Sequence, residues 1–383
     1  MRIAFNMVSP AHGGGFLTYN TNILKGLLDE NDNNEYYVFI NEKLIGSYAI
    51  PISNNIHLTT ISEKYSRMIP RYIWMQTILP IYILRRKIDV LFSPMNIMPI
   101  LLKFFNIRSV LVIHSNLPWL YPKDVPGNKL KLLIQKLFTN LSIKISDKII
   151  VDSKTAKKEL TRIFPTIIDK TIDIYLGLDK NRFIKKKGSV ELLNNKIDIN
   201  KDKYFLSISG AWRYHCLKEL IIAYDDFRHE YKKGPKFLLI TKNTDQQYFN
   251  ELNEVMTTRN FSEDIILIED IDFDLIPLIY SNADLYIFSS YCEVFGFTNL
   301  EAMSCGVPVL TSNKSAMPEI CGEAALYFNP RDPIDIKNKI ANLYSNTNLK
   351  REMIEKGYKR INKYSWENTC AKTKYQILEA HNI

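Results

Sequence analysis

The sequence predicts an α/β protein with two parallel-sheet domains that face each other across a cleft. Short apolar runs rich in β-branched and aromatic residues alternate with segments of helical spacing, and this series occurs twice along the chain. Alternation of this kind is typical of a parallel sheet covered by helices. The 383 residues are long for one domain and sufficient for two. We expect domains at residues 1–185 and 186–364, and a final helix at residues 365–383 that returns to the N-terminal domain.

The first domain opens with a strand, a glycine-rich loop and a helix. Met1–Val8 is the expected strand, and Phe16–Leu28 is the expected helix. Between them lie Gly13, Gly14 and Gly15. In a doubly wound sheet, ligands bind beyond the carboxyl ends of the strands, and glycines let a ligand approach the backbone closely. The loop lacks the G-x-G-x-x-G spacing of a dinucleotide site, and a flexible turn is the alternative interpretation.

His114 directly follows a predicted strand of the first domain, so we expect it to face the ligand crevice of the sheet. A lone histidine is more often structural, which is the alternative. A polar, lysine-rich linker to the second domain is expected at Asn181–Asn200. The other strands of the first domain are expected at Glu35–Ile40, Ile56–Thr60, Asp89–Ser93, Ser109–Ile113, Asp147–Asp152 and Asp173–Leu176.

The second domain repeats the alternation and ends in a series of helices. Its strands are expected at Tyr204–Ser209, Lys236–Thr241, Asp264–Ile268, Ala283–Ser289, Val307–Leu310 and Glu323–Phe328. Helices outside the segment discussed next are expected at Leu217–Phe227, Tyr248–Met256, Asp274–Ser281, Pro333–Tyr344, Leu349–Lys363 and Ser365–Ala380.

The stretch Ser289–Pro308 follows a predicted strand and holds two glutamates, Glu293 and Glu301, with seven residues between them. Thr298 stands three residues before Glu301, which is a capping-box signature for a helix start, and Gly306 ends the predicted helix. A strand–loop–helix unit directs backbone N–H groups and the positive end of a helix dipole at a crevice, which suits a phosphate or diphosphate. Alternatively, Glu301 only caps its helix and Glu293 is a solvated loop residue.

Basic residues are concentrated in the N-terminal half of the chain. Residues 1–190 contain 27 lysines and arginines against 14 aspartates and glutamates, and residues 51–150 contain 14 against 4. In Ile69–Lys87 and Lys129–Lys148 the basic residues alternate with long apolar side chains, as in helices that lie on an anionic membrane surface. The alternative is core-facing helices with a lysine-rich solvent face. No recognition motif accompanies the charge, so nucleic acid is not an expected partner.

Five cysteines without metal-type spacing argue against a disulfide framework and a zinc site, and favour a reducing compartment. No apolar run reaches the roughly 18 residues of a membrane span, and the N-terminus lacks the pattern of a signal peptide. Asp270-Ile271-Asp272 has D-x-D spacing but precedes a predicted helix, so no metal site is expected. These features indicate a cytoplasmic protein that is peripheral at the inner face of the cell membrane.

The segment from Glu301 to Val309 reads E-A-M-S-C-G-V-P-V, and Glu293 stands before it at the spacing given above. This frame resembles the donor-site motif of the retaining glycosyltransferases of family four, which have the GT-B fold. The resemblance covers nearly the whole chain and is strongest over Asn282–Asp332. Supporting matches are Ala283–Leu285, Pro318–Ile320, Asp152-Ser153, Tyr175–Asp179 and Ser365–Glu367.

The resemblance implies roles for these residues. Glu293 and His114 would lie near the transferred sugar, and Glu301 would bind the ribose of the nucleotide. Arg213 and Lys218 would neutralise the diphosphate, although Lys218 is shifted in sequence relative to the family pattern. The resemblance also implies contacts to the donor from Gly13, Gly14 and Gly15, and from the backbone N–H groups of Gly296, Phe297, Thr298 and Asn299.

The implied reaction moves a sugar from a UDP- or GDP-linked donor to a glycan or polyprenyl-linked acceptor, with retention and without a metal ion or another cofactor. Synthesis of a bacterial surface polysaccharide is the implied setting, and the acceptor is expected near Met95–Pro99, His114–Tyr121 and the Gly13 loop. A non-catalytic subunit that binds nucleotide or glycan is the alternative. It is motivated by His215–Lys218, which departs from the family pattern, and by Ser115, which stands where many members have aspartate.

Overall fold

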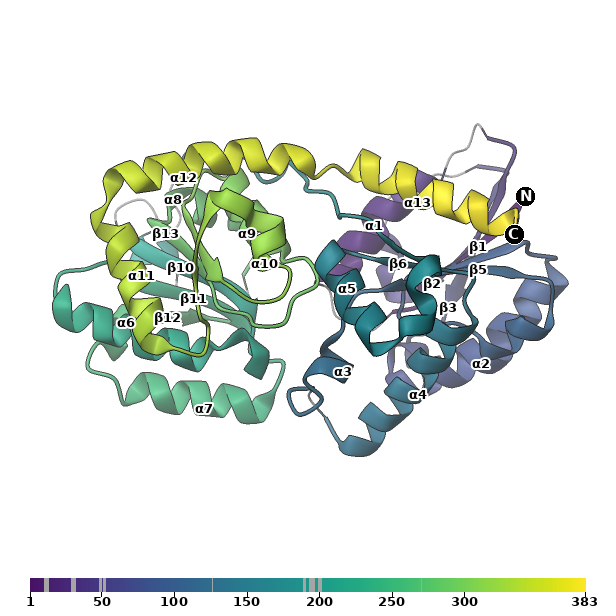
Figure 1. Ribbon diagram of the computed structural model, residues 1–383, viewed down its shortest axis with the longest axis horizontal. Helices are drawn as coiled ribbons and strands as arrows, with labels where there is room; N and C mark the ends of the chain where they lie inside the picture. Colours follow the sequence, from purple (N-terminus) through teal and green to yellow (C-terminus); the bar gives the residue numbers. More distant parts are fainter. Residues whose placement is uncertain are drawn as a thin grey trace. The chain divides into compact units, whose positions relative to one another are not determined.

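The structure is a computed structural model, and it describes residues 1–9, 14–28, 32–47, 50, 53–125, 127–188, 191–192, 197–198, 202–269 and 271–383 (Figure 1). The chain divides into two compact units. Unit 1 comprises Met1–Gly177 and Ser365–Ile383, and unit 2 comprises Leu178–Tyr364. Each unit is built around one parallel sheet with helical connections, which confirms the predicted α/β class.

The sheet of unit 1 has seven strands in the order β3-β2-β1-β4-β5-β6-β7, and every neighbouring pair is parallel. Its central strands are buried on both faces, which explains their continuous apolar sequences. The strands are β1 (Arg2–Asn6), β2 (Glu35–Asn41), β3 (Ile56–Ile61), β4 (Val90–Ser93), β5 (Arg108–Ile113), β6 (Lys148–Val151) and β7 (Thr171–Asp173).

Helices connect the strands of unit 1, and the predicted helix after the glycine-rich loop is present as α1. The α-helices are α1 (Gly15–Leu27), α2 (Met68–Arg85), α3 (Leu117–Leu120), α4 (Lys129–Ile145), α5 (Lys154–Ile163) and α13 (Trp366–His381). The 3-10 helices are η1 (Glu42–Ser47), η2 (Glu63–Ser66), η3 (Ile100–Phe104) and η4 (Pro165–Lys170).

The last helix, α13, belongs to unit 1 although it follows unit 2 in the chain (Figure 1). It packs against α1 and β5, and Ser365 caps its start through its side chain. Thr369 Oγ1 donates a hydrogen bond to the Tyr175 carbonyl at 2.8 Å. Gly177 lies so close to the backbone of Trp366 that a Cβ at this glycine would collide with it. The start of α13 is therefore fixed beside the segment where the chain leaves unit 1.

The main sheet of unit 2 has six strands in the order β12-β11-β10-β13-β14-β15, again with every neighbouring pair parallel. A separate pair of two-residue strands, β8 (Glu191–Leu192) and β9 (Ile197–Asp198), is antiparallel. The strands of the main sheet are β10 (Tyr204–Gly210), β11 (Lys236–Lys242), β12 (Ile265–Ile268), β13 (Leu285–Phe288), β14 (Val309–Ser312) and β15 (Ala325–Phe328).

The helices of unit 2 supply much of its core, in which Tyr224 and Phe227 pack on Phe205 of the central strand β10. The α-helices are α6 (Leu217–Glu230), α7 (Gln246–Thr257), α8 (Ile276–Asn282), α9 (Phe297–Ser304), α10 (Met317–Cys321), α11 (Pro333–Ser345) and α12 (Thr347–Arg360). The 3-10 helices are η5 (Arg213–His215), η6 (Ser262–Asp264), η7 (Phe273–Leu275), η8 (Gly322–Ala324) and η9 (Ile361–Lys363).

Both sheets have a point where the strand order reverses, because β1 lies between β2 and β4, and β10 lies between β11 and β13. Ligands of open α/β sheets bind beyond the carboxyl ends of the strands at such a reversal. In unit 2 the two strands at this point end at Gly210 and Phe288. The segments that follow them carry His215 and Glu293, so the fold places these two residues where a ligand is expected.

Several strands are shorter than the sequence predicts or are shifted along the chain, and β7 and β15 are two examples. β7 spans Thr171–Asp173 and not Asp173–Leu176, although the Ile174 N–H still donates to the Val151 carbonyl at 2.9 Å. β15 begins at Ala325 and not at Glu323, because the preceding residues form the 3-10 helix η8. In both cases apolar residues next to a strand continue its sequence pattern without joining the sheet.

The division between the units falls after Gly177, whereas the sequence predicts a boundary at residue 185, and Asn181–Asn200 does not begin as a free linker. Phe183 is buried, and its ring lies 6.2 Å from that of Phe273, centre to centre. Arg182 forms an ion pair with Asp274 at 2.7 Å. These contacts attach the start of the predicted linker to unit 2.

Besides Gly13 of the glycine-rich loop, two predicted features lie partly outside the described residues. They are the predicted linker, at residues 189–190, 193–196 and 199–200, and the D-x-D pair, at Asp270. The other member of that pair, Asp272, is the N-cap of η7, and its side chain accepts from the Asp274 N–H at 2.9 Å. The described aspartate of the pair is therefore engaged in starting a helix.

Candidate functional site

The loop between β13 and α9 lies against the segment that follows β10. The Tyr291 N–H donates to the Tyr214 carbonyl at 2.9 Å, and Ser289 Oγ donates to the His215 carbonyl at 2.6 Å. The predicted glutamate pair therefore lies at the reversal point of the unit 2 sheet, at its carboxyl edge.

Helix α9 begins before Thr298, so the prediction that Thr298 caps it is wrong. Its first residue is Phe297, and the N-cap is Gly296 with φ 85°, a left-handed conformation that favours glycine. No side chain caps the helix. The Asn299 N–H donates to the Gly296 carbonyl at 3.3 Å, so one of the four N–H groups assigned to phosphate already has a partner. A Cβ on Gly296 would also lie 2.5 Å from Cε of Met317, which leaves no room for a side chain.

The predicted end of α9 at Gly306 is confirmed. Gly306 has φ 76°, and its N–H donates to the Met303 carbonyl at 3.1 Å. The Val307 N–H donates to the Ala302 carbonyl at 3.1 Å. These two bonds form a Schellman motif, which satisfies carbonyls at the end of the helix and turns the chain into β14.

Glu301 is directed at Tyr280 and not at the start of its own helix. The Tyr280 hydroxyl donates to Oε2 of Glu301 at 3.2 Å. Burial raises the pKa of Glu301 to about 7, against the lowering effects of the Tyr280 hydrogen bond and of Arg182. The alternative in which Glu301 only caps its helix is therefore wrong, and its carboxyl group gains a proton close to neutral pH.

Glu293 is held through its backbone and through its carboxylate. Its N–H donates to Ser315 Oγ at 3.1 Å, and its carbonyl accepts from Ser315 Oγ at 2.6 Å and from the Ala316 N–H at 3.2 Å. Its Oε1 lies 3.1 Å from Nε2 of His215. The side chain is 21% exposed, so Glu293 is not a freely solvated loop residue.

His215 has a partner at each ring nitrogen. Nδ1 lies 2.6 Å from the Gly210 carbonyl oxygen, and Nε2 faces Glu293. The next residue, Cys216, has φ 49°, which is uncommon for a residue other than glycine. Such conformations concentrate at functional sites, where the surrounding structure maintains them.

The two predicted diphosphate cations, Arg213 and Lys218, both contact one glutamate of α7. Arg213 binds Glu251 through two nitrogens, at 3.0 and 2.6 Å, and Nζ of Lys218 lies 3.8 Å from the same carboxylate. The hydrogen bonds from Arg213 lower the pKa of Glu251. In this structure the charges of Arg213 and Lys218 are therefore directed at Glu251.

The glycine-rich loop of unit 1 is described from Gly14 onward, and Gly13 lies outside the described residues. Gly14 is the N-cap of α1 with φ 99°, and Gly15 is the first residue of the helix. A Cβ placed on Gly14 or on Gly15 would meet no other described atom within 4 Å. No atom of the described residues therefore blocks an approach to the backbone at these two glycines.

His114 directly follows β5, and its ring nitrogens have unequal surroundings. Nδ1 lies 2.9 Å from Oδ2 of Asp152, which follows the neighbouring strand β6. Nε2 is buried and has no hydrogen-bond partner among the described residues. The ring packs edge-on against Tyr19, with centroids 4.4 Å apart. Asp152 thus orients the ring, and Nε2 is left available to a ligand.

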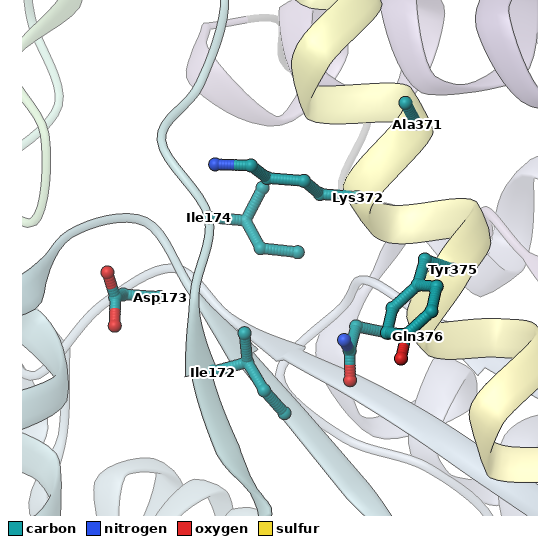
Figure 2. A pocket seen from close by; sticks show the side chains of 7 residues that line it. All are labelled: Ile172, Asp173, Ile174, Ala371, Lys372, Tyr375 and Gln376. Carbon is teal, nitrogen blue, oxygen red and sulfur yellow. The ribbon is translucent and has the colours of Figure 1, made fainter.

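One hollow in unit 1 lies away from these residues. It has a volume of about 410 Å³ and opens between the segment around β7 and the helix α13 (Figure 2). Tyr375 and Gln376 line it from the helix, and the Lys372 side chain extends toward Ile174 (Figure 2). None of the predicted site residues lines this hollow.

Sequence reasoning missed several partners of the predicted residues, among them Asp152, His215, Glu251 and Tyr280. Two of them carried a usable signal, because Asp152 follows a strand that neighbours β5, and His215 follows β10 at the reversal of the sheet. Tyr280 lies on α8, and no pattern in the sequence connects it with Glu301.

Comparison with known proteins adds to this geometry. Residues 182–360 match the family described as glycosyl transferases group 1. The O-antigen chain mannosyltransferase RfbU of Salmonella typhimurium is 23% identical over 254 residues, which cover 64% of this chain and 67% of that protein. The O-antigen chain mannosyltransferase B of Escherichia coli is 24% identical over 268 residues, which cover 70% of this chain and 69% of that protein.

Solved structures are similar over the whole chain. The sucrose-phosphate synthase of Thermosynechococcus elongatus has a TM-score of 0.74 and 17% identity, and the match covers 99% of each chain. Anabaena Alr3699/HepE in complex with UDP-glucose has a TM-score of 0.75 and 16% identity, over 99% of this chain and 100% of that chain. The family match and the curated relatives identify the protein as a glycosyltransferase, and the structural similarity shows the GT-B fold.

Proposed function

We propose that the protein transfers a sugar, with retention, from a UDP- or GDP-linked donor to a glycan or polyprenyl-linked acceptor of a bacterial surface polysaccharide. The observation that carries the proposal is the placement of Glu293 before α9 and of Glu301 within it, with Glu301 not used as a helix cap. The relatives named O-antigen mannosyltransferases support this setting and make mannose the first sugar to test. The neighbour solved with UDP-glucose supports a nucleotide-sugar donor.

In the proposed complex the donor diphosphate lies at the N-terminus of α9. The N–H groups of Gly296, Phe297 and Thr298 and the helix dipole stabilise its negative charge there. This charge grows as the glycosidic bond breaks, so groups fixed in advance at this position lower the barrier without a metal ion. Arg213 and Lys218 add positive charge once the diphosphate draws them away from their partner in α7.

The carboxyl groups bind the hydroxyls of the donor. Glu301 accepts hydrogen bonds from the ribose, and Glu293 accepts them from the transferred sugar. In unit 1, Nε2 of His114 accepts a hydrogen bond from a substrate hydroxyl, with Asp152 keeping the proton on Nδ1. No carboxylate is assigned as a nucleophile, and we propose front-side attack, in which the acceptor hydroxyl and the leaving phosphate share one face of the sugar.

The test of this function is a panel of UDP- and GDP-linked sugars offered to the purified chain, with release of nucleoside diphosphate as the readout. The Glu293→Ala variant should lose transfer while it keeps the fold, which its circular dichroism spectrum checks. Full activity of this variant would contradict the proposal. The alternative of a non-catalytic subunit fits the pairing of Arg213 and Lys218 with Glu251, and turnover by the purified chain alone would exclude it.

We also propose that unit 1 binds the anionic inner face of the cell membrane through a basic–apolar face on α2, η3 and α4. Helix η3 contacts both α2 and α4, and the rings of Tyr72 and Phe138 lie 5.4 Å apart, centre to centre. The exposed apolar side chains of the face are Ile69, Ile73, Ile81, Leu84, Leu101, Phe104, Phe105, Leu130, Leu133 and Leu137. Its exposed basic residues are Arg67, Arg85, Arg86, Lys103, Lys129, Lys131 and Lys144.

Apolar side chains that insert at the headgroup level, flanked by lysines and arginines, are typical of surfaces that bind anionic lipid. Within the described ranges, the chain has no helix with the length and apolar character needed to cross a membrane. Sedimentation with phosphatidylglycerol vesicles should be lost when Leu133→Glu and Lys131→Glu are combined. Wild-type sedimentation of that variant would contradict the proposal, and the unit 2 variant Lys359→Glu serves as the control.

A further inference from the structure

Nε2 of His215 faces Oε1 of Glu293, and this contact requires a proton between the two atoms. Without that proton both atoms can only accept a hydrogen bond. The Gly210 carbonyl oxygen, 2.6 Å from Nδ1, can only accept, so Nδ1 carries a hydrogen. In a neutral imidazole Nε2 then has a lone pair and no hydrogen. That lone pair would face a carboxylate oxygen at 3.1 Å. The pair is attractive only when it holds one further proton, as an imidazolium beside a carboxylate or as a neutral ring beside a carboxylic acid.

Both partners are fixed through their backbones, so the contact cannot relax by movement of the loops. The His215 carbonyl accepts from Ser289 Oγ at 2.6 Å, and the Glu293 carbonyl accepts from Ser315 Oγ at 2.6 Å. The imidazole also packs against the rings of Tyr214 and Phe288, with centroids 4.4 and 5.8 Å away. The Glu293 side chain is therefore the part of the pair that is best able to change position.

The phenols and the thiol near the pair add no positive charge to it. Tyr214 comes from η5, and Tyr291 and Cys292 come from the same loop as Glu293. Burial and then the Glu293 charge raise the pKa of Tyr214 well above its usual value, so this phenol is neutral. The thiol and the second phenol carry no positive charge in either protonation state.

The cations of the neighbouring segments are directed elsewhere. Arg213 and Lys218, on the His215 side, contact a glutamate of α7. Arg331 lies over the Tyr291 ring, 4.0 Å from its centroid. Lys314, which precedes the serine that holds Glu293, is exposed to solvent. Within the pair, the negative charge of Glu293 is therefore balanced by the proton that it shares with His215.

We propose that His215 is a positioning residue that holds Glu293 ready for the donor sugar only while the pair keeps its shared proton. The inference rests on the proposed function, in which Glu293 meets the sugar. It predicts that recognition of the sugar weakens as pH rises, while the nucleoside diphosphate, which Glu293 does not contact, is bound as before.

The substitution His215→Gln tests this, because glutamine places an N–H donor near the position of Nε2 and does not titrate. We would measure kcat/KM for the nucleotide sugar that turns over, from about pH 5.5 to about pH 9. The ratio of wild type to variant should fall about tenfold across this range, the size of one charge-assisted hydrogen bond. The titration of Glu301 is common to both proteins and cancels in the ratio. His229→Gln, which changes a histidine exposed by 54% in the same unit, should follow the wild type.

Two further measurements separate positioning from a structural role. The Kd of UDP and of GDP should differ less than about twofold between wild type and His215→Gln at every pH, the factor expected for a contact not made to the nucleotide. In ¹⁵N-labelled wild-type protein, the Nε2 signal of His215 should titrate while Nδ1 stays protonated. A constant ratio of kcat/KM, or titration at Nδ1, would overturn the inference.

These measurements of kcat/KM, Kd and the ¹⁵N signals also distinguish failure of the inference from failure of the proposed function. Absence of turnover with every donor would reject the proposed function, and the ¹⁵N titration of the wild type would still decide whether the pair shares a proton at Nε2. Turnover with a pH-independent ratio would leave the function in place and reject the role of His215.

Discussion

Two histidines lie beyond strand ends, one in each unit, and each faces a carboxylate through a different ring nitrogen. In unit 1 the carboxylate of Asp152 lies 2.9 Å from Nδ1 of His114, and Nε2 is buried without a hydrogen-bond partner in the described part of the chain. In unit 2 the Gly210 carbonyl lies at Nδ1 of His215 and accepts its hydrogen, and the Glu293 carboxylate contacts Nε2.

This difference separates a residue suited to meet a substrate from one suited to orient another side chain. A buried polar nitrogen without a partner costs free energy, so it persists where a ligand completes its hydrogen bonding. A histidine with partners at both nitrogens has no further hydrogen-bonding capacity. We therefore expect His114 to contact substrate directly and His215 to act through Glu293.

The largest effect is expected from His114→Phe, which removes the open nitrogen and keeps a flat ring. The kcat should fall about 100-fold or more, because a positioned acid–base or hydrogen-bonding group typically contributes this much. The melting temperature should fall as well, because phenylalanine also leaves the buried Asp152 carboxylate without its partner at Nδ1. Steady-state kinetics and thermal unfolding check both expectations, with His57→Phe in the same unit as the control. Unchanged kcat would remove the contrast between the two histidines.

A smaller effect is expected from Asp152→Asn, which keeps the shape of the residue but lets an amide donate to Nδ1. The proton of the His114 ring then moves to Nε2, so the open nitrogen becomes a donor. The kcat, measured at saturating donor, should fall about 10- to 100-fold, the usual cost of losing a group that orients a histidine. The exposed acid Asp169, changed to asparagine, is the matched control. If both variants behave like wild type, Asp152 does not orient a working histidine.

The smallest effect is expected at Glu301, a half-buried residue whose carboxyl group contacts a tyrosine and not a histidine. Its folded pKa of about 7 lies above the ordinary 4.5, so the folded protein loses stability as pH rises between these values. At pH 8 the free energy of unfolding of Glu301→Gln, measured with urea, should therefore exceed that of wild type by on the order of 1–3 kcal/mol. Near pH 4.5 the two free energies should be equal. Glu323→Gln, at a side chain exposed by 92%, should show no such pH dependence. Equal stability of wild type and Glu301→Gln at both pH values would show that burial does not penalise this carboxylate.

The fold followed from the sequence because the buried parallel strands are continuous apolar runs bounded by polar residues. The exceptions are short elements. β7 has only three residues directly after the 3-10 helix Pro165–Lys170, so the apolar residues after it looked like the strand. The segment from Leu178 looked like a linker because it is polar, yet Phe183 buries it in unit 2.

The identities of the candidate residues also followed from the sequence, but their hydrogen bonding did not. Thr298 has the sequence signature of a cap, and Gly296 overrides it because the glycine adopts the left-handed turn that starts α9. The partners of His215 depend on the positive φ of Cys216 and on the distance to the Gly210 carbonyl. Such details arise from tertiary packing and leave no local pattern.

Helix α13 has a consequence for the order in which the protein matures. The ribosome delivers residues 1–177 first, but the helix that packs against α1 and β5 emerges only after all of unit 2. Unit 2 can thus close its core during translation, since domains generally fold as units as they emerge. Unit 1 meanwhile exposes the apolar surface on which α13 packs. Cys370 later packs there beside Gly26, and Trp366 beside Gly177. Unit 1, which is translated before unit 2 except for α13, is therefore the unit that depends longer on protection from aggregation.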